Sequence, residues 1–439
     1  MTTIRDPHFP VLHRVHPRGW VNDPNGIVRT ADGRWHVFFQ HNPASARHEH
    51  IRWGHMSSPD LVTWREEPMG PSPRPGEADA DGCWSGVGLR DRAADPEGTP
   101  TLVYSGVDGG DNQLARVLVA RLDADGTRQI EPARVVAGVP SIEGLIGVRD
   151  PFVFHHGGRR WALQGAGVRA GDRFVPTLPL YSCDDLDRWE LVGTLLDGEH
   201  PVAAEHAPAD LWECPQLVPL DGRWVLLLSR WRHPDRADVS TIQVDYLVGD
   251  LVDAEDGTPR LEPTGGGRVD LGPDFYAPQA VLDADGGRVL CWGWSWEGAE
   301  RSQEQTDAQG WAGTLTFPRE LRLVGDRLLA APAAELAALR AARLPLDGDP
   351  AAQRRLDLPV PARAEIRADG DVRVEVVGAD GAVTEVAEVA GPVTAYLDGS
   401  LLEMLPAQDA PRTVRLYPEA GSVVRVRGAL REAWALDIP

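Results

Sequence analysis

Asp32-Gly33-Arg34-Trp35 is the stretch that decides the fold, because the chain repeats it at intervals. Variants stand at Gly157-Gly158-Arg159-Arg160-Trp161, at Asp221-Gly222-Arg223-Trp224 and, in weaker form, at Asp285-Gly286-Gly287-Arg288. Each is followed by a short run of apolar, β-branched or aromatic residues, such as Val37-Phe38-Phe39. Glycine tolerates the positive φ of a tight turn, so Asp-Gly between two such runs predicts a β-hairpin.

The repeated unit extends beyond its hairpin. A third apolar segment follows each second strand, which makes a unit of three strands with a period of about 60 residues. Five such units fit between about residue 15 and residue 325, and helical periodicity is almost absent there. The sequence therefore predicts an all-β fold with a five-bladed β-propeller, and an irregular pair of β-sandwiches is the alternative.

The composition shifts after the last repeat. Residues 332–343 predict a short helix with Leu336 and Leu339 on one face, which Pro345 would end. Alternating runs such as Val372 to Val376 then return, with Asp-Gly turns between them, and predict a small antiparallel β-sandwich. The predicted units are a propeller over 1–325, a linker with a short helix over 326–354 and a sandwich over 355–439.

Composition and charge limit the partners of this 439-residue chain. Its formal net charge is −22, so a phosphate backbone or an anionic membrane would repel it. No run approaches the roughly 18 apolar residues of a membrane span, and the first residues lack the apolar segment of a signal peptide. The cysteines are far apart and form no CxxC pair, which favours neither a metal site nor a disulfide scaffold. We therefore expect a reduced, cytoplasmic protein without nucleic-acid or membrane partners; its oligomeric state, a homo-oligomer included, is left open.

Three carboxylates stand at matching places in the repeat. Asp23 and Asp150 immediately precede a proline, and Glu213 precedes one by two positions, each where the first strand of a unit begins. Asp-Pro alone is a common way to open a turn. In a propeller, however, the first strand of every blade lines the central channel, so the three acids would converge at one mouth of that channel.

Two carboxylates at one site suit glycoside hydrolysis, in which one acid donates a proton and the other attacks or supports a cationic sugar. Glu213 follows Trp212, and an apolar setting would keep its carboxyl protonated. Asp23 lies between Asn22 and Asn25, whose hydrogen bonds would favour the ionised form. The sequence therefore predicts Glu213 as the proton donor and Asp23 as the ionised partner.

Aromatic residues gather near these acids, and sugar rings present apolar faces on which aromatics stack. For most of the 15 tryptophans, packing between blades is the expected role. The candidates near the acids are Trp20, Trp53, Trp84, Trp212, Tyr276 and Trp294.

With these residues in view, the chain resembles glycoside hydrolase family 32, the group of invertases, fructanases and sucrose-6-phosphate hydrolases. The motifs lie in family order along nearly the whole chain. They are Trp20-Val21-Asn22-Asp23-Pro24-Asn25-Gly26, Phe38-Phe39-Gln40-His41-Asn42-Pro43, Trp53-Gly54-His55, residues 57–64, Trp84-Ser85-Gly86, Arg149-Asp150-Pro151, Trp212-Glu213-Cys214-Pro215, Phe275-Tyr276-Ala277-Pro278-Gln279, residues 310–321 and residues 398–403. Trp84 departs from the usual Phe, and Gln216 stands where an acid often follows, which puts substrate preference in doubt.

The resemblance implies a five-bladed propeller with a β-sandwich, and a role for each acid. Asp23 matches the nucleophile, Glu213 the general acid/base, and Asp150 the acid that holds fructose hydroxyls. The implied mechanism is double displacement with retention, without a metal or an organic cofactor. The expected substrate is a small sugar, sucrose or a short fructo-oligosaccharide. The expected substrate-binding residues are Asn22, Gln40, Trp53, Trp84, Ser85, Arg149, Tyr276 and Trp294.

Several alternatives stay open at this point. A sucrose-6-phosphate hydrolase would need cationic side chains at the rim, where His48, His50 and Arg52 are the nearest candidates by sequence. A fructosyltransferase would pass the sugar to another sugar in place of water. An arabinan- or xylan-cleaving propeller enzyme would usually invert configuration. A sugar-binding propeller without catalysis is the alternative from another functional class.

Overall fold

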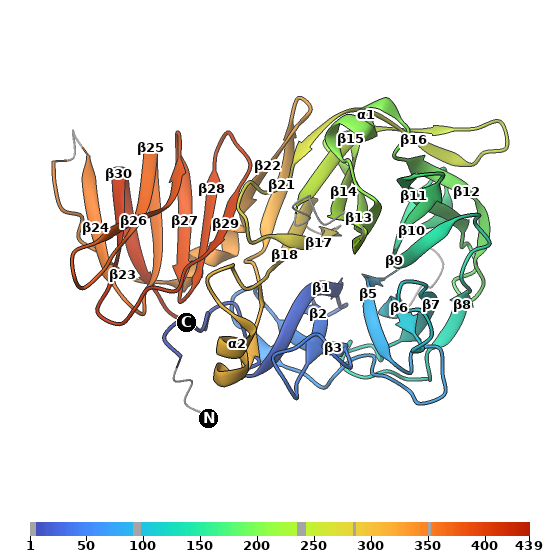
Figure 1. Ribbon diagram of the computed structural model, residues 1–439, viewed down its shortest axis with the longest axis horizontal. Helices are drawn as coiled ribbons and strands as arrows, with labels where there is room; N and C mark the ends of the chain where they lie inside the picture. Colours follow the sequence, from blue (N-terminus) through green and yellow to red (C-terminus); the bar gives the residue numbers. More distant parts are fainter. Residues whose placement is uncertain (1–5, 91–97, 235–242, 284–286, 350–352) are drawn as a thin grey trace.

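The computed structural model describes residues 6–90, 98–234, 243–283, 287–349 and 353–439. Five β-sheets stand around a central channel, and a sixth, larger sheet formed by the C-terminal residues lies beside them (Figure 1). The chain folds as a five-bladed β-propeller with an adjoining C-terminal unit, so the propeller prediction is confirmed.

Each blade is an antiparallel sheet whose first strand lines the channel. Blade one consists of β1 (Gly19–Arg29), β2 (Trp35–Asn42), β3 (Arg52–Ser58) and β4 (Arg65–Glu66). Blade two consists of β5 (Gly82–Leu89), β6 (Thr101–Val107), β7 (Arg116–Arg121) and β8 (Arg134–Ala137). Blade three consists of β9 (Leu145–His156), β10 (Arg159–Ala170), β11 (Arg173–Ser182) and β12 (Glu190–Asp197). Blade four consists of β13 (Leu211–Leu220), β14 (Arg223–Trp231), β15 (Val244–Asp253) and β16 (Pro259–Arg268). Blade five consists of β17 (Tyr276–Asp283), β18 (Arg288–Ser295), β21 (Arg319–Val324) and β22 (Arg327–Pro332), with β20 (Thr314–Leu315) beside β18.

The hairpin signals mark their turns correctly. Asp32-Gly33 joins β1 to β2, Gly157-Gly158 joins β9 to β10, and Asp221-Gly222 joins β13 to β14. The fourth signal, at Asp285-Gly286, lies in a stretch outside the described residues. The prediction of three strands per unit is wrong, because every blade has a fourth, outer strand. These outer strands carry little hydrophobic pattern: the first five residues of β12 are all exposed.

The ring is closed by a short strand from the end of the propeller. In β19 (Trp311–Ala312), Trp311 pairs with Gly19 and Ala312 with Trp20, parallel to β1. The chain that completes blade five therefore also extends blade one. It lies directly beside the start of the channel-lining strand that carries Asp23.

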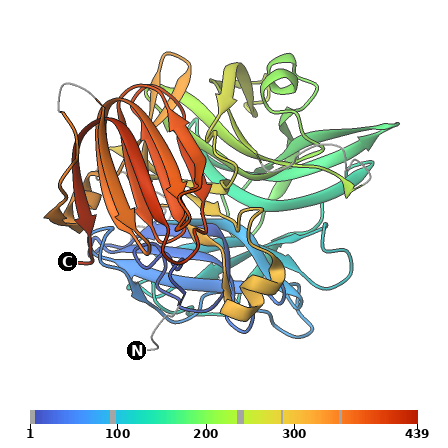
Figure 2. The same ribbon diagram turned by 60° about the vertical axis from the view of Figure 1, so that its left-hand side comes forward.

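The C-terminal unit is an eight-stranded antiparallel sheet. Its strands are β23 (Arg340–Arg343), β24 (Arg354–Pro359), β25 (Arg363–Val377), β26 (Val383–Val389), β27 (Val393–Asp398), β28 (Leu401–Pro406), β29 (Arg412–Arg415) and β30 (Val423–Leu436). The two long strands, β25 and β30, pair with each other along most of their length. On its other side β25 pairs first with β27 and then with β26, while β30 pairs with β24 and then with β23. Figure 2 shows these strands in front, with the propeller behind them.

The expected unit boundaries need correction. The propeller continues past residue 325, because β22 hydrogen-bonds to β21 as the outer strand of blade five. The predicted helix over 332–343 is a shorter 3-10 helix, Ala334–Leu339, although Leu336 and Leu339 are buried as expected. Residues 340–343 form β23, so the C-terminal sheet begins before residue 355.

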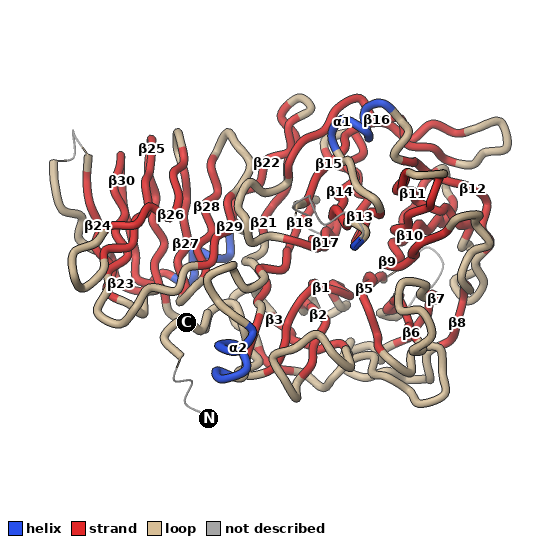
Figure 3. The backbone as a smooth tube through the Cα atoms, in the orientation of Figure 1, coloured by secondary structure: helices blue, strands red, loops and turns tan. Residues whose placement is uncertain are grey.

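Helix is rare in the described chain (Figure 3). Two short helices, α1 (Pro201–His206) and α2 (Gln303–Gln309), interrupt the strand pattern and were not predicted. α2 has a capping box, in which the Ser302 side chain accepts from the Gln305 amide and the Gln305 side chain accepts from Ser302. Among the described residues, no helix is long and apolar enough to cross a membrane.

Candidate active site

Every channel-lining strand has a break in its pairing register at the same level. The breaks lie between Val21 and Pro24 in β1, between Trp84 and Gly86 in β5, between Glu213 and Gln216 in β13, and between Tyr276 and Gln279 in β17. In β9 the break lies between Arg149 and Phe152. β-Bulges of this kind bend a strand and redirect its side chains, and they are frequent next to active sites.

Three consecutive residues occupy equivalent places at each break. The first positions, here called the rim ring, are Asn22, Trp84, Arg149, Glu213 and Tyr276. The second positions, here called the axial ring, are Asp23, Ser85, Asp150, Cys214 and Ala277. The third position is proline in four blades and Gly86 in blade two. In the axial ring, Asp150, Cys214 and Ala277 have positive φ angles of 58°, 45° and 44°. The five blades therefore bend their inner strands in a common way, which brings the predicted acids together.

Asp23 lies in the axial ring, 8% exposed, and is surrounded by hydrogen-bond donors. Asn22 Nδ2 donates to its Oδ1 at 3.0 Å, and Ser85 Oγ donates to its Oδ2 at 2.5 Å. Gln40 Nε2 lies 3.2 Å from the same Oδ2. Burial raises the pKa of Asp23 and Glu213 adds to this, whereas the hydrogen bonds from Ser85 and Asn22 oppose it. These donors favour the ionised form that a nucleophile needs, but they do not outweigh burial, and the pKa of Asp23 stays above its ordinary value.

Asp150 is joined to Asp23 through Cys214. The Cys214 amide donates to Asp150 Oδ2 at 2.9 Å, and Cys214 Sγ lies 3.6 Å from that oxygen and 3.5 Å from Asp23 Oδ2. Burial raises the pKa of the Cys214 thiol well above its ordinary value, so it stays protonated and can donate to either carboxylate. Burial also raises the pKa of Asp150 to about 7, with Arg149 opposing and Glu213 supporting the rise.

Glu213 lies in the rim ring between residues of the two adjoining blades. Arg149 Nε donates to its Oε1 at 2.9 Å, and the Tyr276 hydroxyl lies 2.6 Å from its Oε2. The same hydroxyl is 2.6 Å from the carbonyl oxygen of Arg230. Burial raises the pKa of Tyr276 well above its ordinary value, so the hydroxyl keeps its single proton. When Glu213 is ionised, the hydroxyl can donate its proton to Glu213 Oε2. When Glu213 is protonated, the hydroxyl can donate to the Arg230 carbonyl while its oxygen accepts a hydrogen bond from Glu213.

Aromatic side chains surround the mouth above these acids. The Trp20 ring lies 5.7 Å from Trp294 and 5.9 Å from His48, and the His48 ring lies 5.9 Å from Trp84. Trp294 in turn lies 6.5 Å from Tyr276, which contacts Glu213. Trp20, Trp84 and Trp294 are partly exposed, as side chains that stack on a sugar must be.

The predicted substrate-binding residues are not all at the mouth. Asn22, Gln40, Ser85 and Arg149 contact the acids directly, as described above. Trp53 is 0% exposed and packs against Phe38 and Tyr104, while its Nε1 donates to the Trp84 carbonyl at 3.1 Å. A direct sugar contact is therefore wrong for Trp53, which instead supports the backbone of Trp84.

Three residues have roles that the sequence did not indicate. Cys214 was named only as part of the motif around Glu213, and the alignment of all five breaks places it in the axial ring. His48, named only as a candidate for phosphate, hydrogen-bonds through Nε2 to Gln40 Oε1 at 3.1 Å. Gln216, expected to affect the pocket, accepts instead from the Ala280 amide and braces blade four against blade five. In the described residues, no group of three or more His, Cys, Asp or Glu side chains could hold a metal ion.

The opposite end of the channel is chemically different. A cavity of about 500 Å³ lies there between the later residues of the same inner strands, such as Ile27, Leu89, Phe154, Val218 and Val281. Its lining is mostly apolar and includes none of the three acids. The candidate site is therefore the mouth formed by the rim and axial rings.

The comparisons with known proteins agree with this geometry. The family model described as "Glycosyl hydrolases family 32 N-terminal domain" matches residues 13–332. A sucrose-6-phosphate hydrolase of Klebsiella pneumoniae is 36% identical over 348 residues, which are 77% of this chain and 69% of that protein. A raffinose invertase of Escherichia coli is 33% identical over 345 residues, covering 77% of this chain and 67% of its own length.

Solved structures extend the likeness to the whole chain. The family 32 β-fructofuranosidase BmSUC1 of Bombyx mori aligns with a TM-score of 0.78 at 24% identity, covering 99% of this chain and 95% of its own. A family 32 glycoside hydrolase of Bifidobacterium adolescentis aligns with a TM-score of 0.80 at 22% identity, covering 97% of this chain and 81% of its own. At these identities the structures show a common fold, whereas the family model and the sequence relatives show that this chain belongs to glycoside hydrolase family 32.

Proposed function

We propose that this protein is a retaining β-fructofuranosidase, which releases fructose from sucrose or short fructo-oligosaccharides. The main support for this proposal is the pair Asp23 and Glu213, two carboxylates that lie at one mouth of the channel in contrasting surroundings. Asp23 has hydrogen-bond donors around it, whereas Glu213 has beside it a phenol that can either donate or accept. One site thus brings together a carboxylate surrounded by donors and a carboxyl group whose neighbour accommodates either of its protonation states.

In this proposal Asp23 is the nucleophile. Its carboxylate attacks the anomeric carbon of the fructosyl unit while Glu213 gives its proton to the departing glycosidic oxygen, and a fructosyl ester forms on Asp23. Glu213, now ionised, takes a proton from a water molecule that attacks the same carbon and breaks the ester. Two displacements leave fructose with the original configuration, and both carboxyl groups return to their starting protonation.

The neighbouring residues have supporting roles in the proposal. Asp150 accepts hydrogen bonds from fructose hydroxyls, alongside Asn22, Gln40 and Ser85. Arg149 holds Glu213 through Oε1, which leaves Oε2 as the atom that carries the transferable proton. The half-exposed tryptophans and Tyr276 stack against the sugars.

Sucrose-6-phosphate is the second candidate substrate, because a relative at 36% identity carries the name of a hydrolase of that compound. A phosphate would need an available cation at the mouth. Arg47, Arg149 and Arg230 each already pair with a carboxylate, that of Asp307, Glu213 and Asp245. Arg52, a candidate named from the sequence, instead has a buried Nε without a hydrogen-bond partner among the described residues, so the test below includes both the free and the phosphorylated sugar.

The proposed function is tested by the release of fructose from sucrose, sucrose-6-phosphate, inulin and levan. We expect sucrose to be cleaved by the wild-type protein and Asp23→Ala to lose activity by a factor of about 10⁴ or more, while melting like the wild type. Proton NMR of the first product would show retention. Equal activity in Asp23→Ala would remove the nucleophile assignment, and an inverted product would remove the double displacement.

Two further properties belong to the proposal. We infer that the C-terminal unit is a two-layered β-sandwich, since β25 and β30 each change partners midway and enclose one apolar cluster that includes Ile366, Val374 and Val426. We also infer that the enzyme acts in a reducing compartment such as the cytoplasm. This is supported by Cys83, Cys214 and Cys291, which are buried and form no disulfide within the described part of the chain.

A further inference from the structure

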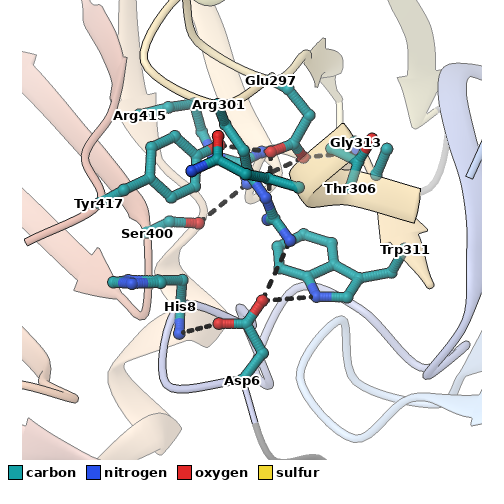
Figure 4. A network of polar contacts seen from close by, with 12 residues as sticks. Asp6, His8, Glu297, Arg301, Thr306, Trp311, Gly313, Ser400, Arg415 and Tyr417 are labelled. Carbon is teal, nitrogen blue, oxygen red and sulfur yellow. Dashed lines mark hydrogen bonds and ion pairs between the residues drawn. The ribbon is translucent and has the colours of Figure 1, made fainter. Parts of the chain in front are cut away.

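The C-terminal unit contacts the propeller through a buried carboxylate, Glu297, which lies between β18 and α2 (Figure 4). Its side chain is 10% exposed. Arg415 and Tyr417 of the C-terminal unit both bind it: Arg415 Nη2 is 3.1 Å from Oε1, and the Tyr417 hydroxyl donates to Oε2. One propeller carboxylate thus anchors two side chains of the neighbouring unit.

The remaining contacts of Glu297 lead back into the propeller. The Gly313 amide donates to Oε1 at 2.7 Å, and Arg301 Nη1 lies 3.2 Å from Oε2. Arg301 Nη2 in turn binds Asp6 at 3.0 Å, and the Trp311 indole donates to the same carboxylate at 2.9 Å (Figure 4). Both oxygens of Glu297 therefore have two donors, and its charge is shared between Arg301 and Arg415.

Gly313 stands directly against the sugar site. Its φ is +70°, and a Cβ there would come within 1.8 Å of the Val21 carbonyl oxygen and 2.8 Å of Trp294 Nε1. Val21 precedes the rim residue Asn22, and Trp294 belongs to the aromatic mouth. The position of the Gly313 backbone, held by Glu297, therefore sets how closely Trp294 and β1 approach each other.

The same segment supports the other side of the mouth. Its strand β19 pairs with Gly19 and Trp20, and α2 reaches the loop that carries His48. Gln303 Nε2 donates to the Ala46 carbonyl at 3.1 Å, and Asp307 forms an ion pair with Arg47. Residues 296–313, here called the bracing segment, thus connect the C-terminal unit to Trp20, His48 and Trp294.

We propose that Glu297 is a positioning residue through which the C-terminal unit holds the aromatic mouth of the sugar site in place. The C-terminal unit then contributes to substrate affinity without touching the substrate. The identity of the ligand rests on the proposed β-fructofuranosidase function, whereas the mechanical link rests on the contacts above.

The test compares full-length Glu297→Gln with the wild type on sucrose. Glutamine keeps the size of the side chain and one acceptor oxygen but removes the charge that Arg301 and Arg415 share. We expect KM to rise by about tenfold while kcat changes by no more than about threefold, because the acids stay in place and the aromatic contacts loosen. Tyr417→Phe, which removes one donor from the C-terminal side, should raise KM in the same direction by a smaller factor.

The matched control is Glu365→Gln, which alters a buried carboxylate inside the C-terminal unit. Glu365 binds Arg340 and Arg367 and is not part of the bracing segment. We expect it to lower the melting temperature without changing KM, at a temperature where all variants are folded. If Glu297→Gln has the KM of the wild type, or if Glu365→Gln raises KM equally, the proposal is overturned.

Near-ultraviolet circular dichroism gives a second reading that needs no substrate. The tryptophan bands should change in Glu297→Gln, because Trp20 and Trp294 lose their fixed packing. Glu365→Gln cannot serve as the control for this reading, since its partner Arg340 lies over the Trp434 ring. The control is Asp357→Asn, which alters the ion pair with Arg425 inside the C-terminal unit and should leave the bands unchanged. Unchanged bands in Glu297→Gln overturn the link even if the wild type proves inactive on sucrose. Changed bands with a wild type that releases no fructose would support the link and contradict the proposed function instead.

Discussion

Asp150 is a buried carboxyl group, and its ionisation should measurably lower the stability of the folded protein. Burial raises its pKa to about 7, so the folded protein binds a proton that the unfolded chain releases near pH 4. The folded state is therefore favoured below pH 4 and loses stability as the pH rises to about 7. Asp150→Asn removes the charge and suits the positive φ of this position. We expect it to raise the melting temperature by a few degrees at pH 8 and by less at pH 5, while reducing kcat by about 10²-fold or more.

Scanning calorimetry at both pH values, beside a sucrose assay, checks this expectation. Asp256→Asn serves as the control, because hydrogen bonds from Thr258 lower the pKa of this exposed carboxyl group. The melting temperature of Asp256→Asn at pH 8 should not exceed that of the wild type. A variant at position 150 that melts below the wild type at pH 8 would show that Asp150 contributes more to the fold than to the chemistry.

The sequence identifies many site residues but not the layers in which they lie. Proline after Asp23, Asp150 and Glu213 points to equivalent places in three blades, and the three acids do meet at one mouth. The sequence also shows that Glu213 stands one residue further from its proline, but only the register breaks show that this offset places Glu213 in the rim ring. The burial of Trp53 was equally hidden, because a tryptophan that supports a site and one that lines it look alike in sequence.

At the scale of the strand, blade two differs from the others by having Gly86 where they have proline. Its amide donates to Asn25 Oδ1 at 3.1 Å, which a proline could not do. A Cβ at this position would also come within 2.0 Å of the Val103 carbonyl oxygen. We therefore expect Gly86→Ala to reduce the free energy of unfolding by about 3 kcal/mol, because the backbones of β5 and β6 must separate.

Urea unfolding measures this loss, and Gly138→Ala is the matched control, since no atom lies within 4 Å of a Cβ there. The control should change the free energy of unfolding by less than about 0.5 kcal/mol. Equal effects in the two variants would mean that β5 and β6 accommodate the methyl group without separating.

Strand prediction succeeded where local chemistry is strong and failed where it is weak. Asp-Gly turns in two blades and a Gly-Gly turn in a third, each between apolar runs, located the inner hairpins of three blades. The outer strands are exposed, as in β12, and are held by hydrogen bonds to a neighbour that is itself already placed. The 3-10 helix at Ala334–Leu339 kept its predicted buried leucines but gave way to β23 after six residues, because Arg340 and Arg343 pair with β30. Tertiary pairing there outweighs local helix propensity.

At the scale of the whole molecule, the union of propeller and C-terminal unit depends on side chains far apart in sequence, which no local pattern indicates. His13 shows this clearly. Its Nδ1 lies 2.8 Å from Asp398 Oδ2 and its Nε2 lies 3.0 Å from Glu403 Oε1, both in the C-terminal unit. Arg319 of blade five also binds Glu403, at 2.6 Å. A histidine can donate a hydrogen bond to a carboxylate from each of its two ring nitrogens only when it is protonated.

This arrangement predicts that the attachment weakens in alkaline solution. Burial lowers the pKa of His13, but the hydrogen bonds and charges of Asp398 and Glu403 outweigh it and raise the pKa above 6.5. A histidine with a raised folded pKa contributes its full stability below about pH 6.5 and loses it as the pH rises through the folded value. We expect the free energy of unfolding in urea to fall between pH 6 and pH 9, with the deprotonation of His13 as one source of the loss. His13→Gln should have a lower free energy of unfolding than the wild type at pH 6. That free energy should decrease less between pH 6 and pH 9 than in the wild type, because glutamine has no proton to lose. If the free energies of unfolding of the variant and the wild type decrease in parallel, His13 does not provide the pH dependence. The neutral imidazole must then stabilise the interface as well as the charged one does.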